Sequence, residues 1–187
     1  MSSTLSISDQ INHKYREYAL YVLQSRGIPN FYDSLTPVQR IILENSPSHY
    51  NKTIGLVGEV IRTGLYHHGD SSLSGAISKL ARPFGCSYQV LEGDGFFGSP
   101  VNPSPSAARY TSVRIKPEVK NIVNRHSDLN EKNEEGGHDW LHIEVPVGLL
   151  THIIGIAVGY RSNILPRKME DIIEYLEGKN KILKPYF

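Results

Sequence analysis

The chain has 187 residues, enough for one domain or one and a half, with 39% hydrophobic and 21% charged residues as in an ordinary globular protein. Its 20 basic and 19 acidic residues give a net charge of +1, so bulk charge gives no support to nucleic-acid binding, and such a function must depend on local placement. The single cysteine excludes an intrachain disulfide, and the lack of a long apolar run or a signal-peptide pattern predicts a cytoplasmic protein without a membrane partner.

Helical spacing of apolar residues predicts four helices in the first half of the chain. The apolar positions expected to face inward are Ile11, Tyr15, Tyr18 and Val22, then Ile54, Val57, Ile61 and Leu65, then Leu73, Ile77 and Leu80. Ser8 is expected to cap the first helix, the pair Thr36–Pro37 begins the second, and Asp70 caps the fourth. Short helices in this order indicate a helix-turn-helix unit.

Strand-like segments and loops dominate the second half. Strands are predicted at residues 87–92, 109–115, 140–146 and 153–159, and helices from Pro117 and around 169–176. The first two strands, joined by a loop rich in glycine and proline, would form a wing beside the helices. The polar stretch 128–139 is expected to be an exposed loop and a domain boundary, and residues 179–187 are expected to be extended.

Five short blocks occur in an order that is hard to obtain by chance, although each alone is a weak signal. They are Arg26-Gly-Ile-Pro29 with Asp33-Ser-Leu-Thr36-Pro-Val-Gln39-Arg40; Tyr66-His67-His68-Gly69-Asp70; Gly93-Asp-Gly-Phe-Phe-Gly98-Ser99; Ala107-Ala-Arg109-Tyr110-Thr111; and Gly155-Ile-Ala-Val-Gly159 followed by Ile164-Leu-Pro166. Together they resemble the breakage-and-rejoining subunit of type IIA DNA topoisomerases, with the greatest likeness to the medium subunit of T-even bacteriophage enzymes. Only the first part of that subunit is covered.

The resemblance implies an α+β fold in two parts. Residues 1–126 would be a winged-helix DNA-gate domain with an N-terminal helix, and residues 127–187 the truncated beginning of a tower-like α/β domain. The implied protein is part of an ATP-dependent type II topoisomerase. This isomerase cleaves and religates duplex DNA through a transient phosphotyrosine.

Tyr110 is the residue that the resemblance identifies as the nucleophile. A phenol hydroxyl can attack a phosphodiester and store the energy of the broken bond, but its pKa of about 10 makes it a poor nucleophile without help. The resemblance places Arg109 in the same active site. In a strand the two side chains would point to opposite faces, whereas at a strand start or bulge both could reach one phosphate. With 11 tyrosines in the chain, composition alone favours an ordinary strand tyrosine.

Six further residues align with DNA-contacting positions of the family: Arg26, Arg40, His67, His68, Ser71 and Val145. The arginines would hold the DNA backbone, one histidine would donate to the scissile phosphate, and Ser71 opens a helix whose amino end could face phosphate. Val145 matches an apolar wedge that bends the duplex, and a buried strand residue is an equally good interpretation. The chain departs from the family at Thr36, which replaces a lysine, and at Asp94 and Phe97 in the glycine block.

The resemblance implies Mg²⁺ and ATP as cofactors, both held by a partner ATPase–Toprim subunit, because this sequence carries neither a DxD motif nor a nucleotide-binding loop. The other implied partners are double-stranded DNA and a second copy of the chain. If the family's polypeptide is split here, a separate chain would carry the rest of the tower and the exit gate. The expected location is the cytoplasm, that of the bacterial host if the protein is phage-encoded.

Two other functions compete with this interpretation. A winged-helix module that binds DNA without cleaving it would keep the fold and form no covalent adduct. A metal hydrolase could use His67, His68 and Asp70, although no second ligand cluster at suitable spacing supports it, so no metal site is predicted.

Overall fold

The computed structural model describes residues 6–179 and 182–186, so parts of both predicted domains, and of the extended end expected at 179–187, lie outside the described residues. The elements are α1 (Ile7–Val22), the π-helical turn η1 (Leu23–Gly27), α2 (Pro37–Asn45), β1 (Asn51–Lys52), α3 (Thr53–Arg62), α4 (Asp70–Ala81), β2 (Leu91–Asp94), β3 (Ser112–Ile115), α5 (Pro117–Asn124), η2 (Ser127–Leu129), η3 (Val147–Leu150), β4 (Ile153–Ala157), β5 (Tyr160–Ile164) and α6 (Met169–Leu176). The fold is α+β, as predicted.

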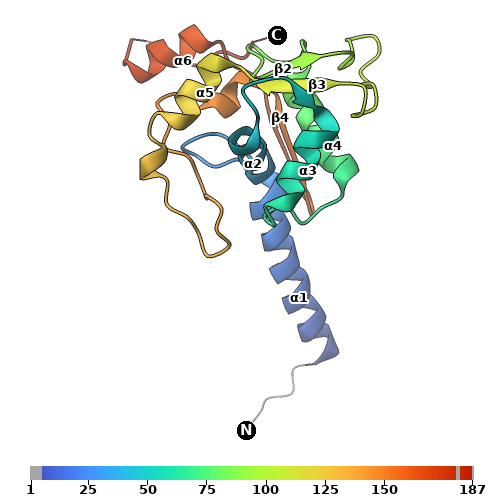
Figure 1. Cartoon of the computed structure of the whole chain (residues 1–187). Helices are drawn as coiled ribbons and strands as arrows, with labels where there is room; N and C mark the ends of the chain where they lie inside the picture. Colours follow the sequence, from blue (N-terminus) through green and yellow to red (C-terminus); the bar gives the residue numbers. More distant parts are fainter. Residues whose placement is uncertain (1–5, 180–181, 187) are drawn as a thin grey trace.

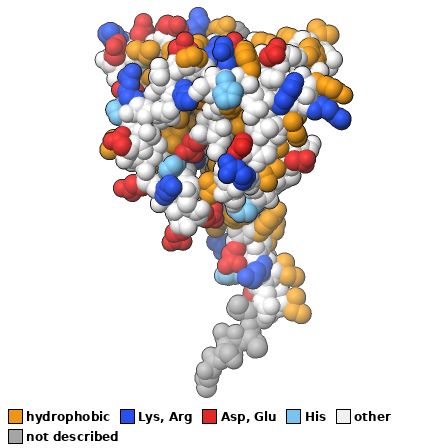
Figure 2. Space-filling view, viewed as in Figure 1, with side chains coloured by type: hydrophobic (Ala, Val, Ile, Leu, Met, Phe, Trp, Pro, Cys, Tyr) orange, Lys and Arg blue, Asp and Glu red, His pale blue; other side chains and the backbone are white. Residues whose placement is uncertain are grey.

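Helix α1 projects from the body of the molecule (Figure 1). It begins earlier than expected, because Ser6 rather than Ser8 caps it by accepting a hydrogen bond from the Asp9 amide. The predicted inward face is wrong for most of its length: Ile11, Tyr15 and Tyr18 are exposed, and Val22 at the helix end is buried. Figure 2 shows the resulting band of hydrophobic atoms along the projecting helix.

Helices α2, α3 and α4 pack together around the main core. Thr36 and Gln39 form a capping box at α2, and the helix begins at Pro37 as predicted. The predicted face of α4 is confirmed, since Leu73, Ile77 and Leu80 are all buried.

The predicted face of α3 is partly wrong. Leu56, Val57 and Val60 are buried, whereas Ile54 and Ile61 remain exposed. The helix ends at Arg62, before the predicted Leu65, because the chain leaves it through a positive φ at Gly64.

The wing is a three-stranded antiparallel sheet in the order β1-β3-β2, with Gly93 paired to Val113. Both long strands are shorter than predicted: β2 covers 91–94 rather than 87–92, and β3 starts at Ser112 rather than residue 109. Arg109 and Tyr110 therefore lie in a turn, where the Tyr110 amide donates to the Ala107 carbonyl over 2.8 Å. The strand alternation expected to separate their side chains does not apply.

A second sheet consists of the hairpin β4–β5, in which Ile153 pairs with Ile164. The strand predicted at 140–146 does not form, because Leu141 instead donates its amide to a buried carboxylate of another loop. The strand β5 at 160–164 was not predicted. Within residues 6–179 and 182–186, no helix has both the length and the apolar character needed to cross a membrane.

Candidate functional site

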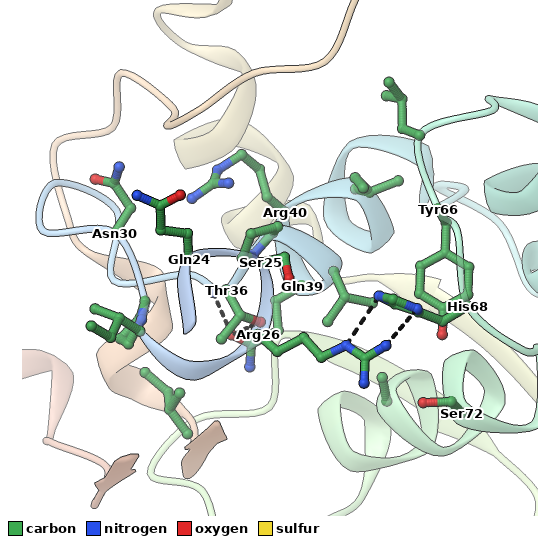
Figure 3. A pocket seen from close by; sticks show the side chains of 18 of the residues that line it. Gln24, Ser25, Arg26, Asn30, Thr36, Gln39, Arg40, Tyr66, His68 and Ser72 are labelled. Carbon is green, nitrogen blue, oxygen red and sulfur yellow. Dashed lines mark hydrogen bonds between the residues drawn. The ribbon is translucent and has the colours of Figure 1, made fainter. Parts of the chain in front are cut away.

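A groove of about 1000 Å³ runs between η1, α2, the amino end of α4 and strand β4. Its lining includes the side chains of Arg26, His67, His68 and Ser71, all predicted from the sequence, and Lys79, which was not. Figure 3 shows Arg26 and His68 pointing toward one another from opposite walls. Outside the groove, the face seen in Figure 2 mixes acidic and basic side chains, as expected for a net charge of +1.

Arg26 and His68 are in direct contact although 42 residues separate them. The guanidinium Nε lies 3.1 Å from Nε2 of the imidazole, and one terminal nitrogen lies 2.6 Å from Nδ1. Desolvation, and next the positive charge of Arg26, lower the pKa of His68 below its ordinary value, with a smaller contribution from His67. The neutral imidazole therefore serves as an acceptor that orients Arg26 in the groove.

The amino end of α4 forms the floor of the groove. Gly69, not the predicted Asp70, is the capping residue, and Asp70 is the first residue of the helix. The Asp70 carboxylate accepts the Ser71 amide over 2.8 Å, which satisfies one first-turn donor within the chain. The Ser71 hydroxyl and the His67 ring are exposed at this end, open to a ligand.

Arg40 has a structural role that the sequence did not predict. Its side chain is 3% exposed, and its Nε donates to the Asp33 carboxylate over 2.7 Å. The terminal nitrogens also donate to the Leu35 and His138 carbonyls. A buried and paired guanidinium has few donors left for a phosphate, so the expected DNA contact of Arg40 stays a prediction without support from this geometry.

The turn that carries Tyr110 is held on two sides. The amide of Thr53, at the start of α3, donates to the Thr111 carbonyl, and the two buried threonine hydroxyls share a hydrogen bond of 2.8 Å. On the other side, Gly95 has a φ of +105° and packs so closely that an added Cβ would lie 3.4 Å from the Tyr110 carbonyl oxygen. The backbone of the turn is therefore fixed.

The Tyr110 side chain itself is 68% exposed, although its backbone is fixed. The Arg109 guanidinium lies 5.4 Å from the centre of the Tyr110 ring, so the two side chains share one side of the turn. Neither residue lines the groove of Arg26 and His68. Thr53 was missed from the sequence, since a threonine at a helix start reads as an ordinary capping residue.

The sequence pattern of the DNA gyrase/topoisomerase IV family, for the polypeptide termed A, matches residues 26–186. The chain belongs to this family.

Individual relatives agree. The DNA gyrase A protein of Buchnera aphidicola subsp. Baizongia pistaciae (strain Bp) is 32% identical over 96% of this chain, and that of Escherichia coli (strain K12) is 31% identical over 90%. The crystal structure of the Plasmodium falciparum topoisomerase II DNA-binding, cleavage and re-ligation domain superimposes with a TM-score of 0.80 at 31% identity, over 97% of this chain and 27% of that one. The chain spans 23% and 21% of the two gyrase A proteins.

Two departures from the gyrase A family have structural explanations. Thr36, in place of the family's lysine, is buried and caps α2. Phe97 fills the core beneath the glycine block, where its ring lies against the site of a missing Cβ at Gly93. Val145 is half-buried and packs against the main core, so the structure accounts for it without DNA.

Proposed function

We propose that this chain is the DNA-cleaving part of a type IIA topoisomerase and that Tyr110 forms a transient covalent bond to DNA. One observation carries the proposal: in a chain of the gyrase A family, an exposed tyrosine stands on a turn whose backbone is clamped between α3 and the glycine block. Fixed geometry of this kind is what an attacking group needs, because misplacement by an ångström costs much of the rate.

The proposed chemistry is a transesterification. The Tyr110 oxygen forms a bond to phosphorus, the bond from phosphorus to one deoxyribose oxygen breaks, and the phenol proton leaves so that the released oxygen can take one up. Arg109 lies beside the ring and would place its positive charge near the phosphate, whose negative charge grows in the transition state. Religation is the reverse reaction.

The groove of Arg26 and His68 would bind the DNA backbone. Arg26 is presented by His68 rather than neutralised by a carboxylate, so its full charge is available to a phosphate. Ser71 and His67 would add donors at the amino end of α4, where phosphate is favoured by the helix dipole. Val145 as a wedge between base pairs and Arg40 as a backbone contact complete the predicted set.

The family implies Mg²⁺ and ATP. No three His, Cys, Asp or Glu side chains of the described residues gather closely enough to hold a metal ion, so these residues do not fit a magnesium site. We place both cofactors on a partner, the ATPase–Toprim subunit, and propose that two copies of the chain cut opposite strands. A phage origin and a cytoplasmic location belong to the same proposal.

The His67–His68–Asp70 metal interpretation finds no support in this geometry. Both ring nitrogens of His68 face the Arg26 guanidinium, and a bound cation would have to displace that positive group.

A covalent-trapping assay tests the nucleophile. The chain would be mixed with end-labelled duplex DNA, Mg²⁺ and the cognate ATPase–Toprim subunit, then denatured and examined for labelled protein. We expect an adduct with the wild-type chain and with Tyr175→Phe, a matched exposed tyrosine on α6, and none with Tyr110→Phe.

Each other outcome has a definite meaning. An adduct that persists in Tyr110→Phe shows that another residue is the nucleophile. If the wild-type chain forms no adduct yet retards the DNA in a binding assay, the chain is a non-catalytic winged-helix binder.

A further inference from the structure

Four aromatic rings stack on the surface where two distant loops meet. The ring centres of Phe31 and Tyr32 lie 5.7 Å apart at 81°, those of Tyr32 and Trp140 lie 4.4 Å apart, and those of Trp140 and His142 lie 3.9 Å apart. We call this set the aromatic ladder. Its first two rings are largely in solvent: Phe31 is 90% exposed and Tyr32 is 60% exposed. Two adjacent aromatic side chains left this open forgo the stabilisation that burial would give.

The ladder is held rigidly by polar contacts beneath it. The buried Asp33 carboxylate accepts the Leu141 amide over 3.0 Å and so ties the loop of Phe31 to that of Trp140. The Asn30 side chain accepts the Tyr32 amide and donates to the Asp139 carbonyl. Because these contacts fix both loops, a partner that docks on the rings need not order them first.

The charges around the ladder indicate the kind of partner. The adjoining loop, residues 128–139, has one basic residue and five acidic ones, all five exposed: Asp128, Glu131, Glu134, Glu135 and Asp139. Open ring faces beside carboxylates suit a guanidinium, which can stack on the rings while its charge is balanced. The same carboxylates repel a phosphate backbone.

The ladder is also separate from the groove proposed to bind DNA. Asn30 and Asp139 line that groove, but none of the four ladder rings does. The same two loops therefore present their polar side chains to the groove and their rings elsewhere.

We propose that the aromatic ladder is a docking surface for an arginine-bearing basic segment of a partner protein. An arginine would stack on Tyr32 and Phe31, and neighbouring basic residues would pair with the carboxylates of residues 128–139. This surface has no part in the cleavage chemistry proposed for Tyr110.

The single tryptophan of the chain, Trp140, lies within the ladder and reports on its occupancy. The full chain would be titrated with hexa-arginine, hexa-lysine and a twelve-residue oligothymidylate while Trp140 emission is recorded. We expect a saturable change with hexa-arginine and about fivefold weaker binding of hexa-lysine. The Phe31→Ala variant should bind hexa-arginine about fivefold more weakly than the wild type does. Phe96→Ala, an exposed phenylalanine of the glycine block, is the matched control and should bind as the wild type does.

Several results would overturn the proposal. Equal affinity of wild type and Phe31→Ala for hexa-arginine, or equal affinity for the two peptides, would mean that charge alone attracts them. Saturable quenching by the oligonucleotide at lower concentration than by the peptide would make the ladder a nucleic-acid platform instead. No response to hexa-arginine would also sink it. Circular dichroism melting of each variant confirms that the fold is kept, and the readout does not depend on DNA cleavage.

Discussion

The Arg26 guanidinium faces both ring nitrogens of His68 across the groove, at 3.1 and 2.6 Å. A neutral imidazole can accept one of these contacts, but a protonated one accepts none and adds a second positive charge. The two residues come from separate sequence blocks, and their contact couples the protonation of His68 to the placement of Arg26.

This contact predicts a loss of stability in mild acid. The folded pKa of His68 is lowered, so the unfolded chain binds a proton at higher pH than the folded one does. The contribution of His68 is therefore complete above its unfolded value of about 6.5 and is lost as the pH falls from there toward the folded pKa. Urea midpoints measured from about pH 7.5 to 5.5 should fall less steeply for His68→Asn than for wild type. Parallel curves for the two proteins would contradict the prediction, and His49→Asn, on an exposed loop, is the control.

Thr53 is predicted to position Tyr110. Thr53→Val keeps the shape but leaves the buried Thr111 hydroxyl without its partner, so the turn should shift. We expect the rate of covalent adduct formation to fall roughly tenfold with DNA affinity unchanged. Thr53→Ser, which keeps the hydroxyl, should restore the rate. A purely structural role would instead lower stability in Thr53→Val without any change in the single-turnover rate of the folded protein.

Asp33 is predicted to be a major determinant of stability. Asp33→Ala would leave Arg40 charged, buried and unpaired and would remove the acceptor of the Leu141 amide. The expected cost is about 3 kcal/mol or more in the free energy of unfolding, measured by urea denaturation. Glu59→Ala, which breaks the exposed ion pair with Arg62 on α3, should change it far less. Similar losses for the two variants would show that burial of the Asp33–Arg40 pair does not matter.

Gly148 and Gly58 should respond to alanine in opposite directions. A Cβ at Gly148 would collide with the backbone carbonyl of Ser34, so Gly148→Ala should destabilise the fold by about 2 kcal/mol or more. Gly58 lies within α3 with open space around its Cβ position, so Gly58→Ala should stabilise it by about 0.5 kcal/mol. Thermal melting of the two variants gives the comparison, and a stable Gly148→Ala would refute the close approach of these loops.

Elements with local signals could be predicted well from the sequence. The start of α2 follows from Thr36 and Pro37, because a capping side chain and a preset φ act within one turn. The start of α5 at Pro117 follows in the same way. The inward face of α4 follows from three apolar residues at helical spacing that have no exposed competitor.

The predictions failed where distant parts of the chain decide the outcome. The spacing of Ile11, Tyr15 and Tyr18 predicts a helix correctly but does not say whether any surface lies opposite it, and here the helix projects. Residues 140–146 alternate like a strand, yet the Leu141 amide bonds to Asp33 and no neighbouring strand pairs with this segment of the described chain.

The order of amino acids was enough to identify the family, the succession of the site blocks and the residue types that could attack or bind a phosphate. Which of those residues meet depended on the fold. Tertiary packing joined Arg26 to His68, buried Arg40 against Asp33, and left Tyr110 exposed on a backbone clamped by Thr53 and Gly95. Residue types can be read locally along the chain, whereas burial, charge pairing and exposure depend on contacts between segments tens of residues apart, which no local pattern encodes.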